Sequence, residues 1–148
     1  MQSFRVIKPT AALVPYVRHY WVLSDDALAP VSERTLPVGC VQMVFHRGRQ
    51  LFSLTEGRLQ PSSFISGQAF GYSDVESTGM LEMIVVVFQP FAAKAFLHMP
   101  VSEFRGMNVN TEETGDPLLV DLGRRIADMP DRVACIRLIE EFLLSRLY

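Results

Sequence analysis

The chain has 148 residues, and 49% of them are hydrophobic, which is enough apolar material for one domain with its own core. Lys and Arg total 14 against 16 Asp and Glu, so the formal net charge is −2. Because nucleic-acid-binding domains carry a clustered excess of basic residues, this balance argues against direct DNA binding by this chain.

The sequence has no signal for secretion or for a membrane. Residues 1–5 lack an apolar signal core, and the longest apolar run, residues 83–88, is too short to cross a bilayer. Cys40 and Cys135 lie far apart and form no Cys-x-x-Cys pair, so we expect two free, buried thiols in a reducing compartment. The sequence thus predicts a soluble cytoplasmic protein.

Up to residue 90 the sequence has the alternation and composition of β-strands. Residues 17–23 predict a strand with His19 and Trp21 on one face and Tyr20 on the other. Residues 40–46 predict a second strand, in which Gln42 and His46 share a face and the opposite face belongs to the core.

Further strands follow before residue 90. Arg47-Gly48 predicts a hairpin turn into a strand at residues 50–54, and Glu56-Gly57 predicts the next turn. Residues 64–68 and 81–88 complete the set, and the last of these is apolar on both faces, so it should be the most buried. Short strands broken by Gly and Pro indicate a sandwich or small barrel.

After residue 90 the pattern becomes helical. Residues 91–98 predict a short helix. Asp116-Pro117 is a capping carboxylate followed by Pro at the first helical position, and Pro130 ends that helix and begins a last one. The fold class is therefore mainly β with C-terminal helices, with a β-barrel core over residues 1–90 and a helical segment over 91–148 within one structural domain.

Catalytic and metal-binding motifs are missing from this sequence. His19, His46 and His98 fall on three separate elements without a His-x-His pair, so we expect no metal site and no cofactor. Cys40 has no evident base, and no Gly-x-Ser-x-Gly elbow is present. These observations favour a protein that is not an enzyme.

A binding cavity is a better candidate, because ligand sites are mostly apolar with a few placed polar groups. Trp21, Gln42 and His46 would supply an aromatic wall and hydrogen-bonding groups if their strand faces point into a barrel, and Gln68 is a further candidate of this kind. The alternative is that Trp21 belongs to an ordinary core and that Gln42 and His46 face solvent.

The last helix has apolar residues over about half of its circumference, which is more than one neighbour usually needs. It either covers one end of the β body or also pairs with a second copy of the chain. We expect both, and we predict a homodimer contact through Leu138, Phe142 and Leu144, the last of which falls among the charged residues of the helix.

A series of short motifs resembles the N-terminal regulatory domain of AraC-type transcriptional regulators. In chain order these motifs are Leu13-Val14-Pro15-Tyr16-Val17, Tyr20-Trp21, Pro37-Val38-Gly39-Cys40, Val44-Phe45, Ser66-Gly67-Gln68, Val87-Phe88-Gln89-Pro90-Phe91-Ala92-Ala93 and Met99-Pro100-Val101-Ser102-Glu103-Phe104. The resemblance implies a cupin-like β-barrel followed by helices, a small-molecule effector, and DNA binding through a helix-turn-helix half that would follow Tyr148.

Two positions depart from the family pattern. Val38 stands where the family usually has Asp, and Gln42 stands where an acidic residue is common. The resemblance therefore implies no particular effector. The alternatives are a small cupin-like enzyme, such as an isomerase or metal-dependent oxygenase, and a dimerisation module with a filled barrel.

Overall fold

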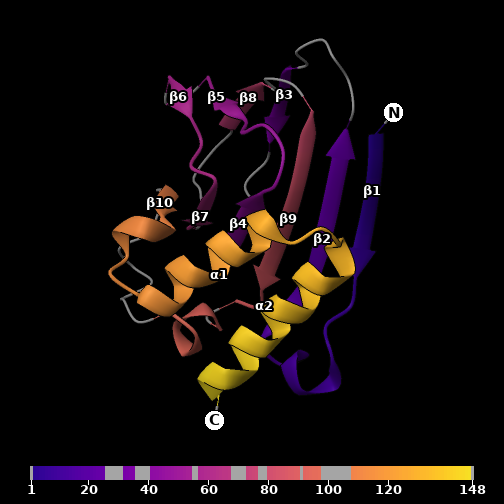
Figure 1. Cartoon of the computed structure of the whole chain (residues 1–148), viewed down its shortest axis with the longest axis vertical. Helices are drawn as coiled ribbons and strands as arrows, with labels where there is room; N and C mark the ends of the chain where they lie inside the picture. Colours follow the sequence, from indigo (N-terminus) through magenta and orange to yellow (C-terminus); the bar gives the residue numbers. More distant parts are fainter. Residues whose placement is uncertain are drawn as a thin grey trace.

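The computed structural model shows a β-sheet body with two helices at its C-terminal end (Figure 1). It describes residues 2–25, 32–35, 41–54, 57–67, 73–76, 80–90, 92–97 and 108–147. The strands are β1 (Gln2–Ile7), β2 (Val17–Asp25), β3 (Ser32–Thr35), β4 (Gln42–His46), β5 (Phe52–Ser53), β6 (Arg58–Leu59), β7 (Ser63–Ser66), β8 (Ser73–Glu76), β9 (Leu81–Phe88) and β10 (Asn108–Asn110). The helices are α1 (Pro117–Asp128) and α2 (Arg132–Leu147), with short 3₁₀ turns η1 (Ala11–Leu13), η2 (Ala93–Ala95) and η4 (Thr111–Glu113).

The strands form two antiparallel sheets. One sheet has six strands in the order β1-β2-β9-β4-β7-β10, and the other has four in the order β3-β8-β5-β6. Strand β9 lies inside the larger sheet between β2 and β4, and seven of its eight residues are buried. A strand that is covered on both faces needs apolar side chains on both, as the sequence of β9 predicts.

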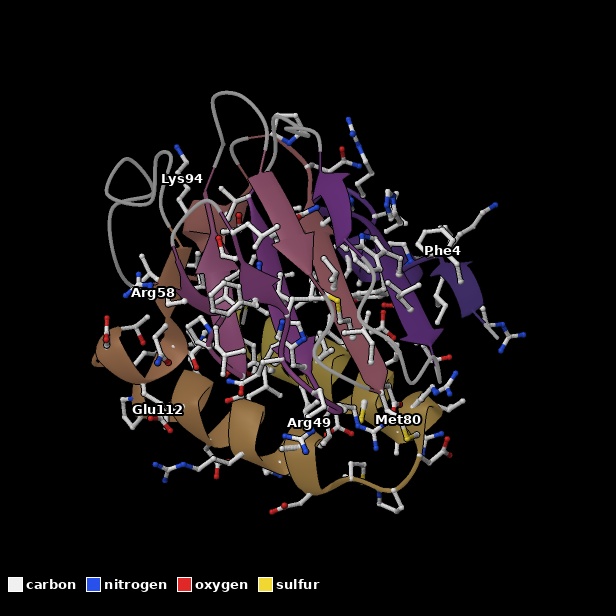
Figure 2. The ribbon with its side chains drawn as sticks, turned by 90° about the horizontal axis from the view of Figure 1, so that it is seen from above. Phe4, Arg49, Arg58, Met80, Lys94 and Glu112 are labelled. Atoms are coloured by element: carbon white, nitrogen blue, oxygen red, sulfur yellow. The ribbon has the colours of Figure 1, made fainter. Side chains whose placement is uncertain are left out.

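Both helices cover the same face of the six-stranded sheet (Figures 1 and 2). Side chains of that face, including Met43, Ile84 and Phe88, form one cluster with residues of α1 and α2. The other face carries a second cluster, made of Val44, Phe64, Leu81, Met83, Val85 and Val87, with Trp21, Leu23 and Leu51 packed against it. We call these the helix face and the helix-free face.

Polar contacts hold the two helices in place. The Asp116 carboxylate caps α1 by accepting a hydrogen bond from Leu119 N, and it forms a buried ion pair with Arg146 at 2.7 Å. At the other end of α1, the Arg47 guanidinium donates to the carbonyls of Ile126 and Met129. Cations are favourable at a helix C-terminus, so the β4 end anchors α1 there.

Several predicted elements are confirmed. Strand β9 has the predicted bounds, α1 begins at Pro117 with Asp116 as its cap, and α1 and α2 end and begin on either side of Pro130. The turn at Gly57 joins β5 to β6, and its positive φ of 72° suits glycine. Cys135 is a free, buried thiol whose pKa is raised by that burial; Cys40 and His98 lie outside the described residues.

The predicted hairpin at Arg47-Gly48 is wrong. Strand β4 pairs with β7 and β9, whereas β5 pairs with β6 and β8 in the other sheet. The backbone of this segment instead bonds to the start of β9, where Arg47 N donates to Glu82 O at 2.7 Å. A Cβ on Gly48 would lie 2.6 Å from Met80 O, so the glycine allows this close approach.

The segment after residue 90 also differs from its prediction. Within residues 92–97 the structure has only the 3₁₀ turn η2 in place of a longer helix. Residues 108–110 form β10, which pairs with β7 in the six-stranded sheet, so this segment contributes to the β body as well as to the helices. Among the described residues, no helix has the length and apolar character needed to cross a membrane.

Candidate functional site

The helix-free face brings together three of the four ligand residues predicted from the sequence. Trp21 pairs in register with Val85 of β9, and Val85 pairs in turn with Val44 of β4. Gln42 and His46 lie at the two ends of β4, on the same face as Val44. The fourth predicted residue, Gln68, lies outside the described residues.

The register arranges this face in three rows across the strands. The rows are Leu23–Met83–His46, then Trp21–Val85–Val44–Phe64, and then His19–Val87–Gln42–Ser66. The middle row is apolar, and the two outer rows carry the polar groups. Gln42 and His46 are four residues apart on one strand, about 13 Å, so they flank the apolar row.

Strand β1 extends this apolar surface at the edge of the sheet. Val6 pairs with Trp21, and Phe4 pairs with Leu23. The rings of Phe4 and Trp21 lie 5.7 Å apart at 40° (Figure 2 labels Phe4). Phe4 and Val6 are 59% and 57% exposed, whereas Trp21 is partly buried, so the aromatic side of the face is accessible from solvent.

His46 is the most deeply buried polar residue of this face that the structure describes, at 4% exposure. Its Nε2 lies 3.0 Å from Gln60 Oε1, and its ring stacks on Phe64 at 6.1 Å. Burial lowers the pKa of the His46 imidazole, and the Gln60 hydrogen bond opposes this only in part. The imidazole is therefore neutral near pH 7.

Arg47, the residue after His46, makes its contacts on the opposite side of the sheet. Arg47 contacts the end of α1, and it forms an ion pair with Glu82, which also binds Arg132 in the first turn of α2 at 3.1 Å. Neither Arg47 nor Gln60 was predicted as a site residue, because their partners lie 14 to 82 residues away in the sequence.

The structure places the predicted dimer residues on α2. Leu138 and Phe142 are 8% and 9% exposed and pack in the core of the single chain, over the helix face. Leu144 is partly buried against the same core, although the sequence placed it among the charged residues. Packing within one chain thus accounts for Leu138 and Phe142, and a dimer contact through these three residues stays a prediction.

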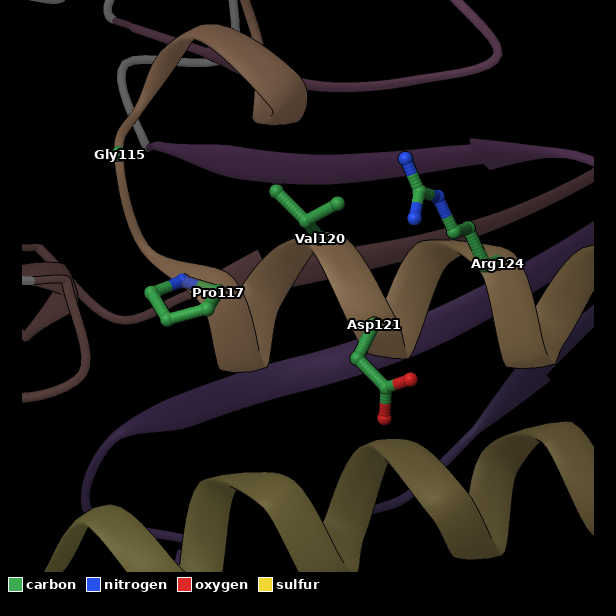
Figure 3. A pocket seen from close by; sticks show the side chains of 5 residues that line it. All are labelled: Gly115, Pro117, Val120, Asp121 and Arg124. Carbon is green, nitrogen blue, oxygen red and sulfur yellow. The ribbon is translucent and has the colours of Figure 1, made fainter.

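A hollow lies along α1, near its N-terminal end (Figure 3). It has a volume of about 580 Å³ and is lined by Gly115, Pro117, Val120, Asp121 and Arg124. Asp121 and Arg124 are exposed, and the hollow opens widely to solvent. Because ligand pockets usually enclose most of their ligand, this open hollow is a weak candidate for a ligand site.

Metal-binding chemistry has no visible basis in the part of the chain that the structure describes. Within these residues, no group of three or more His, Cys, Asp or Glu side chains could hold a metal ion. His19 and His46 share a face but lie on β2 and β4, two strands apart with β9 between them. The arrangement offers hydrogen bonds and apolar contacts to a ligand.

Comparison with known proteins gives a family. No curated protein matches this sequence. Residues 5–110 match the family described as domain of unknown function (DUF6597), a region that runs from β1 to β10 and includes the helix-free face. Since this match spans more than half of the chain, the protein belongs to the DUF6597 family.

Proposed function

We propose that the protein is an effector-sensing and dimerisation domain of an AraC-type transcription regulator, and that the effector binds on the helix-free face. The observation that carries the proposal is the meeting of Trp21, Gln42 and His46, three residues from separate parts of the sequence, on one face of the sheet. The order of the AraC-like motifs and a β body followed by helices support the same function.

A cupin-like barrel is part of this proposal. The six-stranded and four-stranded antiparallel sheets provide the strands for such a fold, and among the described strands the chain passes between them after β2, β3, β4, β6, β7 and β8. In a regulator of this type, helix-turn-helix units follow the sensor domain and contact DNA. The net charge of −2 agrees with a chain that leaves DNA binding to such units.

The end of β4 offers a route from the ligand to the helices. His46 faces the proposed ligand, whereas Arg47, the next residue, holds the C-terminal carbonyls of α1 and reaches the start of α2 through Glu82 and Arg132. A ligand that binds one arrangement of this corner more tightly than another would shift the position of the helices. Such differential binding is what coupling between two sites requires.

A ligand screen that uses the single tryptophan tests the proposal. Trp21 is the one Trp of the chain, so its fluorescence reports on the helix-free face alone. We expect at least one uncharged small metabolite from a library to change this fluorescence with saturation. The Gln42→Ala variant should then bind it roughly fivefold to tenfold more weakly, because one hydrogen bond is lost.

Gln89→Ala is the matched control. The Gln89 amide donates to Val14 O beyond the end of β9, so its removal should leave the affinity unchanged. A library in which no compound changes Trp21 fluorescence, or equal weakening by both Gln variants, would contradict ligand binding at this face.

A further inference from the structure

One nitrogen of His46 is an unused hydrogen-bond acceptor inside the protein. Its Nε2 lies 3.0 Å from Gln60 Oε1, and a carboxamide oxygen can only accept, so Nε2 carries the hydrogen. In a neutral imidazole the other nitrogen, Nδ1, then holds a lone pair. Gln60 thus fixes the tautomer, and Nδ1 can accept a hydrogen bond but cannot donate one.

No described residue bonds to this Nδ1 atom, which is shielded from solvent. Buried polar atoms are nearly always paired, because leaving one unpaired sacrifices its hydration without replacement. His46 is 4% exposed, and its ring is held in place by Gln60 on one side and by the stacked Phe64 ring. The unpaired acceptor is therefore fixed in a definite position on the helix-free face.

The described side chains on the same sheet face as this acceptor carry no charge. On the helix-free face, the described side chains of β1, β2, β4, β7 and β9 include no Asp, Glu, Lys or Arg. They are Phe4, Val6, His19, Trp21, Leu23, Gln42, Val44, His46, Phe64, Ser66, Leu81, Met83, Val85 and Val87. A charged group placed against these described side chains would lose hydration without gaining an opposite charge from them, which disfavours it there.

We propose that the ligand of the helix-free face presents an uncharged, apolar body to the sheet and donates one O–H or N–H hydrogen bond to His46 Nδ1. This inference rests on the proposed function, because it takes the same face as the binding site. It adds the chemical class of the ligand and the direction of the hydrogen bond.

Three small probes separate the parts of this inference. Phenol has an apolar ring and an O–H donor, toluene has the ring without the donor, and benzoate has the ring with a negative charge. Binding is followed by the amide shifts of residues 42–46 in ¹H–¹⁵N NMR spectra. We expect phenol to bind roughly tenfold more tightly than toluene, and benzoate not to bind at millimolar concentration.

Substitutions at the imidazole test the role of Nδ1. In His46→Phe the preference for phenol over toluene should fall to about onefold, while toluene affinity is kept. Gln89→Leu, which lies beyond the end of β9, is the control, and it should keep the preference of the wild-type protein. Should His46→Phe fail to fold, Gln60→Leu serves instead, because it frees the tautomer and should lower the same preference.

Imidazole ¹⁵N spectra give a readout that does not depend on affinity. We expect His46 Nδ1 to resonate as an unprotonated nitrogen and Nε2 as a protonated one, and phenol to shift Nδ1 only. A protonated Nδ1, equal affinities for phenol and toluene, tight binding of benzoate, or no binding by any probe would each overturn the inference. If the metabolite library nevertheless yields a ligand that requires Gln42 but not His46, the inference fails and the proposed function stands.

Discussion

Burial of the His46 side chain makes the stability of the folded protein depend on pH. The folded state lowers the pKa of His46 below its ordinary value of about 6.5, whereas the unfolded chain keeps that value. Between the two pKa values the unfolded state binds more protons. The free energy of unfolding therefore has its full value above about pH 6.5. It decreases as the pH falls toward the pKa that His46 has in the folded state.

Urea unfolding between pH 5 and pH 8 tests this dependence. We expect the wild-type protein to lose stability below about pH 6.5. The His46→Gln variant should show a flatter profile in that range. His19→Gln is the control, because the His19 pKa is also lowered but the side chain is less buried, and its profile should stay close to that of the wild type. Parallel profiles for wild type and His46→Gln would contradict this assignment.

The absence of a side chain at Gly123 allows α1 to approach β7 closely. A Cβ at this position would lie 2.7 Å from Ser63 Oγ, which is itself bonded to Thr111 Oγ1 at 2.6 Å. Gly→Ala inside a helix normally stabilises by about 1 kcal/mol. Here we expect Gly123→Ala to destabilise by about 1–2 kcal/mol, because the Ser63 hydroxyl must move.

The Ser63→Ala background supplies the control for this glycine. With the hydroxyl removed, Gly123→Ala should become neutral or stabilising by up to about 1 kcal/mol. Chemical denaturation of the four variants in this cycle measures the coupling. If the effects of the two substitutions are additive, the Ser63 hydroxyl is not the group that excludes a side chain at position 123.

The ion pair between Asp116 and Arg146 joins the first turn of α1 to the last turn of α2. Arg146 Nη2 lies 2.8 and 2.7 Å from the two carboxylate oxygens, and the pair is buried. We expect Asp116→Ala to lower the free energy of unfolding by about 3–5 kcal/mol, because it removes a buried carboxylate that pairs with the guanidinium through both of its oxygens.

Asp116→Ser separates the ion pair from the cap of α1. Serine can still accept from Leu119 N, so this variant loses the ion pair alone. Its loss in urea unfolding should be smaller than that of Asp116→Ala by about 1 kcal/mol. Equal losses would mean that the cap does not contribute, and a loss below 1 kcal/mol in both would contradict the importance of the buried pair.

Elements with a strong local pattern could be predicted from the sequence. The apolar run of β9 and the Asp116-Pro117 start of α1 were found with their bounds, because each is encoded by neighbouring residues. Strand β1 was missed because its Phe4 and Val6 are exposed, so its pattern shows no buried face. The short, polar strands β3, β6, β8 and β10 also lack such a pattern.

Pairing between distant segments could not be predicted. A glycine at position 48 indicates a turn, but it does not say that the chain leaves one sheet for the other. Period-two alternation did place Trp21 and His19 on one face, and Gln42 and His46 on one face. That these two faces coincide depends on β9 lying between their strands, which no local pattern encodes.

At the scale of the whole molecule, the proposed homodimer can be tested at a residue of α2 that is less buried than Phe142. Phe142 is buried within one chain, so a charge there would damage the fold itself. Leu144 is partly buried and Val133 is 64% exposed on the same helix. If α2 forms the contact, Leu144→Lys should convert a dimer into a monomer in light scattering, while Val133→Lys leaves the dimer intact. A dimer unchanged by Leu144→Lys would contradict the predicted contact.

The most direct test of the account is a map of where a ligand binds. The 148-residue chain is titrated with the best compound from the metabolite library, and ¹H–¹⁵N NMR spectra follow the chemical shifts of all backbone amides at once. We predict the largest shifts at residues 19–23 and 42–46, with no change at the exposed side of α1. Shifts confined to the hollow formed by Gly115, Val120 and Arg124 would contradict binding on the helix-free face.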